Sequence, residues 1–74
     1  MRIDLPVRSE VTVEIFDLQG RQIRSLLDGT LPAGRHQRSW DGKRAGGSPA
    51  TAGVYLVRFS TQGVRLTRKA ILVR

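Results

Sequence analysis

The 74-residue sequence lacks cysteine altogether and is poor in the residues from which most active sites are built. Without cysteine there is no disulfide, no thiolate nucleophile and no cysteine-ligated zinc. The single histidine, His36, falls in a short basic strand, where a lone surface histidine is far more often solvated than catalytic. Apolar runs span only a few residues, far fewer than the ~20 of a membrane-crossing helix. We therefore expect no enzyme, no catalytic residue, no cofactor, no metal and no membrane span.

Aromatic residues are also scarce, with two phenylalanines, one tryptophan and one tyrosine. Proteins that bind single-stranded nucleic acid need exposed aromatic rings on which bases stack, and a carbohydrate-binding platform has a similar need. Trp40, Tyr55 and Phe59 fall at expected core positions, and only Phe16, at the end of a strand, would be partly exposed. We expect no nucleic-acid partner, and a carbohydrate-binding accessory module is the least favoured reading.

Acidic residues are outnumbered, six against 13 basic ones, for a net charge of +7. Residues 1–34 carry four basic and five acidic groups, whereas residues 35–74 carry nine and one. Such a field attracts anionic surfaces and raises encounter rates without naming a partner. The glycine-containing stretch 41–53 has one carboxylate, Asp41, too few for calcium, and it lacks the ending of a phosphate-binding loop.

Apolar and polar residues alternate with a period of two over most of the chain, which predicts β-strands. The pattern places strands at residues 3–5, 11–16, 21–27, 36–40, 54–60 and 64–73. The doubled leucine at 26–27 allows a bulge, and residues 28–29 are expected to close the third strand. Because the loops are short, antiparallel pairing is expected. We predict a small immunoglobulin- or fibronectin-III-like β-sandwich of about six to seven strands, with a five-stranded barrel as the competitor.

Turn-forming residues separate these strands. Hairpin turns are predicted at residues 17–20, 31–34 and 61–63. Asp17 and Asp28 both stand beside turn glycines, where aspartate accepts hydrogen bonds from backbone amides. We expect Trp40 to be a core indole under the long loop, and the Tyr55 hydroxyl to hydrogen-bond the loop backbone.

Several short motifs occur along the chain in a fixed order. In sequence they are Leu5-Pro6, the hairpin residues Val11, Val13, Ile15, Asp17, Gly20 and Arg21, the turn 31–34, the structural motif Trp40, Asp41, Gly42, Gly53 and Tyr55, and a basic terminus from Arg68. The part from Trp40 to Tyr55 resembles the Ig-like domain of the flagellar hook-capping protein family. The whole order is similar to the C-terminal sorting domains of the type IX secretion system.

The second resemblance implies a non-catalytic C-terminal module, spanning residues 1–74, of a longer secreted bacterial protein. Such a module directs its cargo through the periplasm to the cell surface, where an outer-membrane secretion machinery reads it and anionic surface polysaccharide can hold the cargo. We expect a monomer whose candidate recognition residues are Arg65, Arg68, Lys69 and Arg74. These cations could equally serve only to solvate an outer face and protect an edge strand.

The alternative function belongs to a different class. It is a structural Ig-like spacer or assembly domain, as the resemblance to the hook-capping family implies. The two readings share the fold and differ in what the basic final strand is for.

Overall fold

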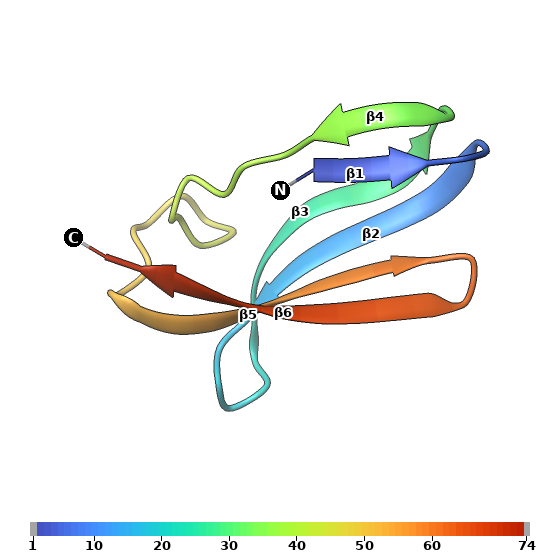
Figure 1. Ribbon diagram of the computed structural model, residues 1–74. Coiled ribbons are helices and arrows are strands. Elements are labelled where there is room, and N and C mark those ends of the chain that lie inside the picture. The colour runs from blue at the N-terminus through green and yellow to red at the C-terminus, as the bar shows by residue number, and fades with distance from the viewer. Residues whose placement is uncertain (1, 74) are drawn as a thin grey trace.

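The computed structural model describes residues 2–73 as two antiparallel β-sheets that face each other (Figure 1). The strands are β1 (Arg2–Leu5), β2 (Ser9–Phe16), β3 (Gln22–Leu31), β4 (Gly34–Gln37), β5 (Gly53–Thr61) and β6 (Val64–Leu72). β1 and β4 form a two-stranded sheet, and the other four strands form a sheet in the order β3-β2-β5-β6. No helix occurs between residues 2 and 73. The predicted all-β antiparallel sandwich is confirmed.

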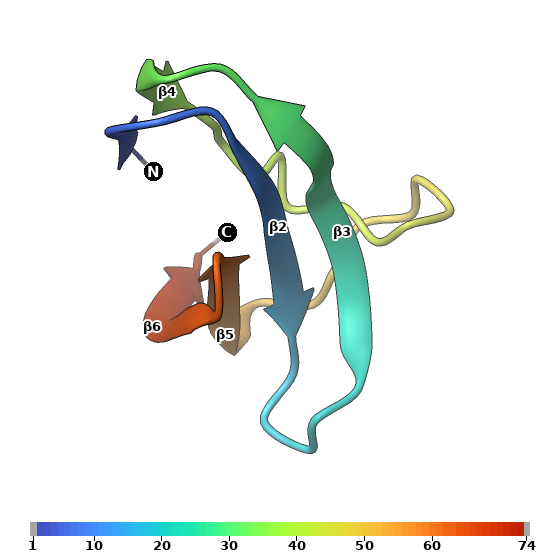
Figure 2. The ribbon, with the colours of Figure 1, turned by 90° about the vertical axis from the view of Figure 1, so that its right-hand side faces the viewer.

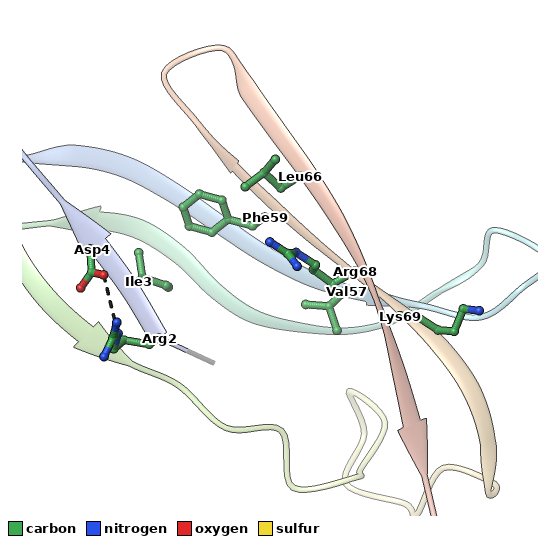
Figure 3. Close-up of a pocket in the computed structure, with 8 residues that line it drawn as sticks. All are labelled: Arg2, Ile3, Asp4, Val57, Phe59, Leu66, Arg68 and Lys69. Carbon is green, nitrogen blue, oxygen red and sulfur yellow. Dashed lines mark ion pairs between the residues drawn. The ribbon is translucent and has the colours of Figure 1, made fainter.

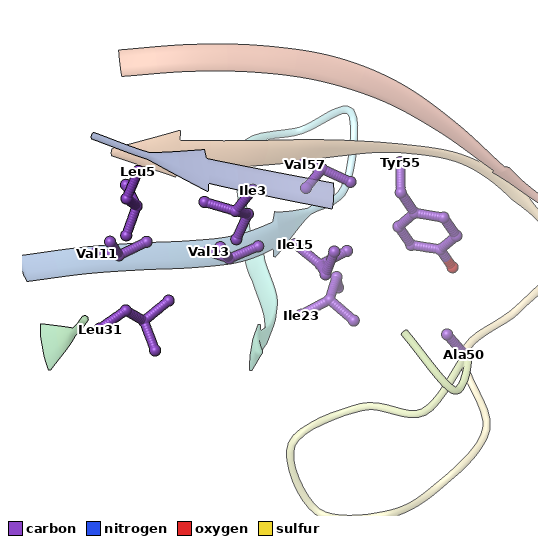
Figure 4. Close-up of a cluster of buried hydrophobic side chains, with 10 residues drawn as sticks. All are labelled: Ile3, Leu5, Val11, Val13, Ile15, Ile23, Leu31, Ala50, Tyr55 and Val57. Carbon is purple, nitrogen blue, oxygen red and sulfur yellow. The ribbon is translucent and has the colours of Figure 1, made fainter. Parts of the chain in front are cut away.

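The core lies between the two sheets and follows from alternation along β2. Val11, Val13 and Ile15 point inward and are at most 1% exposed, whereas the residues between them face the other side of the sheet. Ile3 and Leu5 of β1 approach them from the opposite sheet (Figure 4). The remaining buried apolar residues are Ile23, Leu31, Ala50, Tyr55 and Val57. Full burial of one such aliphatic side chain contributes about 1.5–3 kcal/mol.

β3 continues beyond its predicted end. Asp28 and Gly29, expected to close the strand, pair with β2, and the ladder runs on to Leu31. The Leu31 side chain is buried in the core, so burial at the far end holds the intervening residues in extended conformation. The expectation that Asp28 caps a turn is therefore wrong.

The bulge expected at the doubled leucine is present. Val13 pairs with Leu27 and the next residue of β2, Glu14, pairs with Ser25, which leaves Leu26 as the extra residue. A bulge increases the local twist of a strand pair.

β4 lies earlier in the chain than the predicted strand at 36–40. It pairs residue for residue with β1, from Leu5 opposite Gly34 to Arg2 opposite Gln37. Its bounds therefore follow those of the four-residue β1, and Trp40 belongs to the loop that follows.

The hairpin of β5 and β6 forms one edge of the larger sheet. The two strands pair without a register shift from Gly53 opposite Leu72 to Thr61 opposite Val64. β6 pairs with no other strand among residues 2–73. Figure 2 shows β1 and β6 on the same side of the molecule, away from β2 and β3.

Candidate interaction surface

The first turn is held by a single carboxylate. Asp17 accepts hydrogen bonds from the backbone N–H groups of Gln19 and Arg21, both at 2.9 Å, and from Nε of Arg21 at 2.8 Å. Burial alone would raise the pKa of Asp17, but the hydrogen bonds and charge of Arg21, with the Gln19 amide, outweigh it and hold the pKa below its ordinary value. The Asp17 carboxylate therefore stabilises this hairpin.

A second carboxylate organises the long loop. Asp41 accepts hydrogen bonds from the backbone N–H of Lys43 at 3.0 Å and from the Arg24 guanidinium at 2.9 Å. The Lys43 amide, and then the charges of Arg24 and Lys43, place the pKa of Asp41 below its ordinary value. The Lys43 carbonyl in turn accepts hydrogen bonds from Arg24 and from the Trp40 indole. These contacts tie the loop to β3.

Two aromatic rings join this loop to β5. Trp40 and Tyr55 meet edge to face, with centroids 5.1 Å apart and planes at 73°. The hydroxyl of Tyr55 donates a 2.6 Å hydrogen bond to the carbonyl of Thr51. The Tyr55 ring is buried and its hydroxyl points toward the loop, as Figure 4 shows. Trp40 is partly buried and packs against the core edge.

The glycines of this motif take different places. Gly42 is buried with a φ of +77°, and a Cβ built there would lie 3.2 Å from Cδ1 of Leu72 in β6. Gly53 opens β5 opposite the same leucine. The structure thus brings Trp40, Asp41, Gly42 and Tyr55 into one cluster, and each makes contacts inside the fold rather than facing a ligand.

The candidate recognition cations do not share one face. Val57 and Phe59 turn toward the core, and their partners across the β5–β6 pair are Arg68 and Leu66. Arg68 therefore lies on the inner face of β6, whereas Arg65 and Lys69 alternate with it. Arg74 lies outside the described residues.

A groove opens between β1 and β6, with a volume of about 610 Å³. Its apolar lining comes from Ile3, Val57, Phe59 and Leu66. Its charged lining comes from Arg2, Asp4, Arg68 and Lys69. Figure 3 shows the Arg68 guanidinium directed toward β1 and the Lys69 side chain directed away from it. Sequence reasoning missed this groove because it depends on the two-stranded sheet being narrower than the four-stranded one.

Residues 2–73 could also have carried a metal-binding cluster, a membrane-spanning helix or exposed aromatic rings. No group of three or more histidine, aspartate or glutamate side chains in that range could hold a metal ion. No helix there is long and apolar enough to cross a membrane. The exposed large apolar residues of the described chain include no aromatic ring. The Phe16 ring lies under the Arg58 guanidinium, 4.3 Å from its centroid.

Comparison with known proteins decides the family. A family model described as the FlgD Ig-like domain matches residues 2–63. The chain belongs to the FlgD Ig-like domain family. The predicted Ig-like fold and the resemblance to the hook-capping family are thereby confirmed.

Curated relatives carry the same name. The basal-body rod modification protein FlgD of Salmonella typhimurium (strain LT2) is 44% identical to this chain over 51 residues. FlgD of Salmonella typhi matches to the same extent. Each alignment covers 69% of this chain and 22% of the relative, so the chain spans about a fifth of the length of these FlgD proteins. No solved structure matches.

The prediction of a type IX sorting module is wrong. The match to the FlgD Ig-like domain covers the hairpin, the turns and the Trp40–Tyr55 motif that had suggested sorting. Those features are therefore accounted for by the FlgD Ig-like domain. The basic terminus that favoured sorting begins after residue 63, outside the match. The expected partners, an outer-membrane secretion machinery and surface polysaccharide, depended on that reading and lose their basis.

Proposed function

We propose that this chain is a non-catalytic Ig-like assembly module that acts in building a bacterial flagellum. The observation that supports the proposal most directly is the 44% identity to basal-body rod modification proteins, together with the family match over residues 2–63. A location in the cell envelope or beyond it belongs to the same proposal. The module would act by presenting a surface held by its Ig-like fold, because the Ig-like domain is what this region shares with those proteins.

The internal chemistry of the chain supports a structural role. Three polar groups of the Trp40–Tyr55 motif make hydrogen bonds within the fold. They are the Asp41 carboxylate, the Trp40 indole and the Tyr55 hydroxyl. Together these contacts attach the long loop, which connects β4 to β5 in the chain, to the strands β3 and β5.

A chimera tests the proposal. In the Salmonella typhimurium rod modification protein, the stretch that aligns with this chain is replaced by residues of this chain, and swimming in soft agar is measured in a strain lacking the native protein. We expect motility to return. A chimera carrying Ile15→Asp, which places a charge in the core, is the control for folding and should not restore swimming.

A second chimera separates assembly from passive spacing. It carries an unrelated Ig-like sandwich of similar length at the same position. If that chimera swims as well as the first, the module is only a spacer. If the first chimera accumulates to normal levels and the cells still do not swim, the proposed function is wrong for this chain.

A further inference from the structure

We propose that the free edge of β6 accepts an extended segment of a partner protein, in which apolar side chains and a central carboxylate face the groove between β1 and β6. The inference deepens the proposed function by naming the chemistry of the partner, and it rests on that function only for its biological setting.

The first step is the unpaired backbone. β6 is nine residues long and pairs only with β5 within the described chain. Its other side presents the N–H and C=O groups that a further strand uses. The larger sheet also has β3 at its opposite edge. Only β6 lies against the groove, because no residue of β3 lines it.

The second step is the uncovered apolar surface beside that edge. The two-stranded sheet covers β2 well, but the inner face of β6 lies beyond it, and Val64 and Leu66 remain 53% and 48% exposed. Leu66 lines the groove with Phe59 and Val57 on one side and Ile3 of β1 on the other. A strand added to β6 would place alternate side chains in this space, where apolar groups gain by leaving water.

The third step is an uncompensated charge. Arg68 stands on the inner face and makes no ion pair or side-chain hydrogen bond with residues 2–73. The acid in the groove lining, Asp4, is already shared between Arg2 and Arg35, at 3.6 Å from each. A carboxylate on an incoming strand, directly opposite Arg68, would form a cross-strand pair of opposite charge. The groove therefore favours an acidic position within an apolar face.

The same charges argue against a second copy of this chain as the occupant. Residues 64–73 contain Arg65, Arg68 and Lys69 and no acidic residue. Two β6 strands side by side would bring these cations together, and like charges across a strand pair are destabilising. The occupant is therefore a segment of different sequence, with acidic residues where β6 has basic ones.

The register of β6 defines a probe. Its inner-face residues are Val64, Leu66, Arg68, Ala70 and Leu72, with Arg68 at the centre. A nine-residue peptide with valine at its inner positions, glutamate at the central one and threonine between them is complementary in either direction. The matched control peptide has lysine in place of the glutamate. Fluorescence anisotropy of labelled peptides gives their affinities, and amide hydrogen exchange shows which strand becomes protected.

We expect the glutamate peptide to bind about tenfold more tightly than the lysine peptide, since the exchange replaces an attractive cross-strand pair with a repulsive one. Exchange protection should appear at β6. Arg68→Glu should reverse the preference between the peptides. Arg65→Glu changes the same charge on the same strand, but on the alternate face, and should leave the ratio within about threefold. The comparison of the two peptides on the unaltered protein requires no variant to fold.

Several outcomes would overturn the proposal. These are no binding of either peptide at millimolar concentration, equal binding of both, protection at β3 instead of β6, or concentration-dependent dimers of the chain that protect β6 without peptide. The chimera test is independent of this one. A motile chimera with no peptide binding refutes the docking edge and leaves the proposed function standing, and peptide binding with a non-motile chimera does the reverse.

Discussion

Replacing Gly42 with alanine tests how the long loop is fastened to the last strand. Gly42 has a φ of +77°, in the left-handed region, where an L-residue costs about 1–2 kcal/mol. Alanine also lowers the conformational entropy of the unfolded chain, which stabilises the folded state by about 0.4–1 kcal/mol. Backbone terms alone thus predict a loss of about 0–1.6 kcal/mol.

Crowding adds a second term at this position. The new Cβ would lie 3.2 Å from Cδ1 of Leu72, a side-chain end that must shift by a few tenths of an ångström. We assign about 1 kcal/mol to that displacement, the low end of the cost of overpacking. The total loss for Gly42→Ala is then about 1–2.6 kcal/mol, or a fall in Tm of roughly 4–21 °C for a domain of this size.

The chain supplies a matched control for the backbone term. Gly20 has a φ of +88°, and no atom lies within 4 Å of a Cβ built there. Gly20→Ala should therefore lose only the backbone part. Urea and thermal unfolding, followed by far-UV circular dichroism and Trp40 fluorescence, give both values. In a Leu72→Ala background the cost of Gly42→Ala should fall to that of Gly20→Ala. Equal costs of the two glycine substitutions in the unaltered background would refute the reasoning.

Three further predictions concern the core, the loop and the first turn. Ile15→Val should lower the free energy of unfolding, measured in urea, by about 0.5–1.5 kcal/mol, because Ile15 is 1% exposed. Ile71→Val is the control, and because Ile71 is 69% exposed it should change that free energy by no more than about 0.5 kcal/mol. Similar losses at both sites would contradict the assigned core. Tyr55→Phe removes the 2.6 Å hydrogen bond to the Thr51 carbonyl and should lower the free energy of unfolding by about 1 kcal/mol in the same assay. An unchanged urea midpoint would show that this hydrogen bond makes no net contribution to stability. The pKa of Asp17 lies below 3.8 in the folded state, so the stability advantage of the native chain over Asp17→Asn should be complete well above that pH and disappear as the pH falls through the folded pKa. Urea unfolding of both proteins across the acid range checks this, and an advantage that grows in acid would contradict the assigned role.

Local signals predicted much of the fold. The alternation at residues 11–16 and 54–60 gave two central strands and the faces they bury. Aspartate and glycine at residues 17–20 gave the hairpin turn, since both the caps and the backbone conformation are local. The bulge at Leu26 was also readable, because two adjacent leucines cannot both face the core of a regular strand.

The features that the sequence did not predict depend on contacts between residues far apart in the chain. The end of β3 depends on Leu31 reaching a core built by other strands, and the bounds of β4 depend on its partner β1. The basic residues of the final strand looked like one surface, whereas the register with β5 places Arg68 on the opposite face from Arg65. The function was misassigned for a related reason, since most of the motifs that favoured sorting lie within the matched FlgD Ig-like domain.

The strand order also governs when this chain can fold. β2 occupies the interior of its sheet only when Val11 meets Thr61 and Phe16 meets Leu56, so the sheet closes after nearly the whole chain is present. Before that, local pairs such as the β2–β3 hairpin can form, and an isolated hairpin is marginally stable in water. Topologies dominated by such distant pairings fold on a millisecond-to-second scale. The order of the strands along the chain therefore makes this sandwich form late, only after β5 is available to pair with β2.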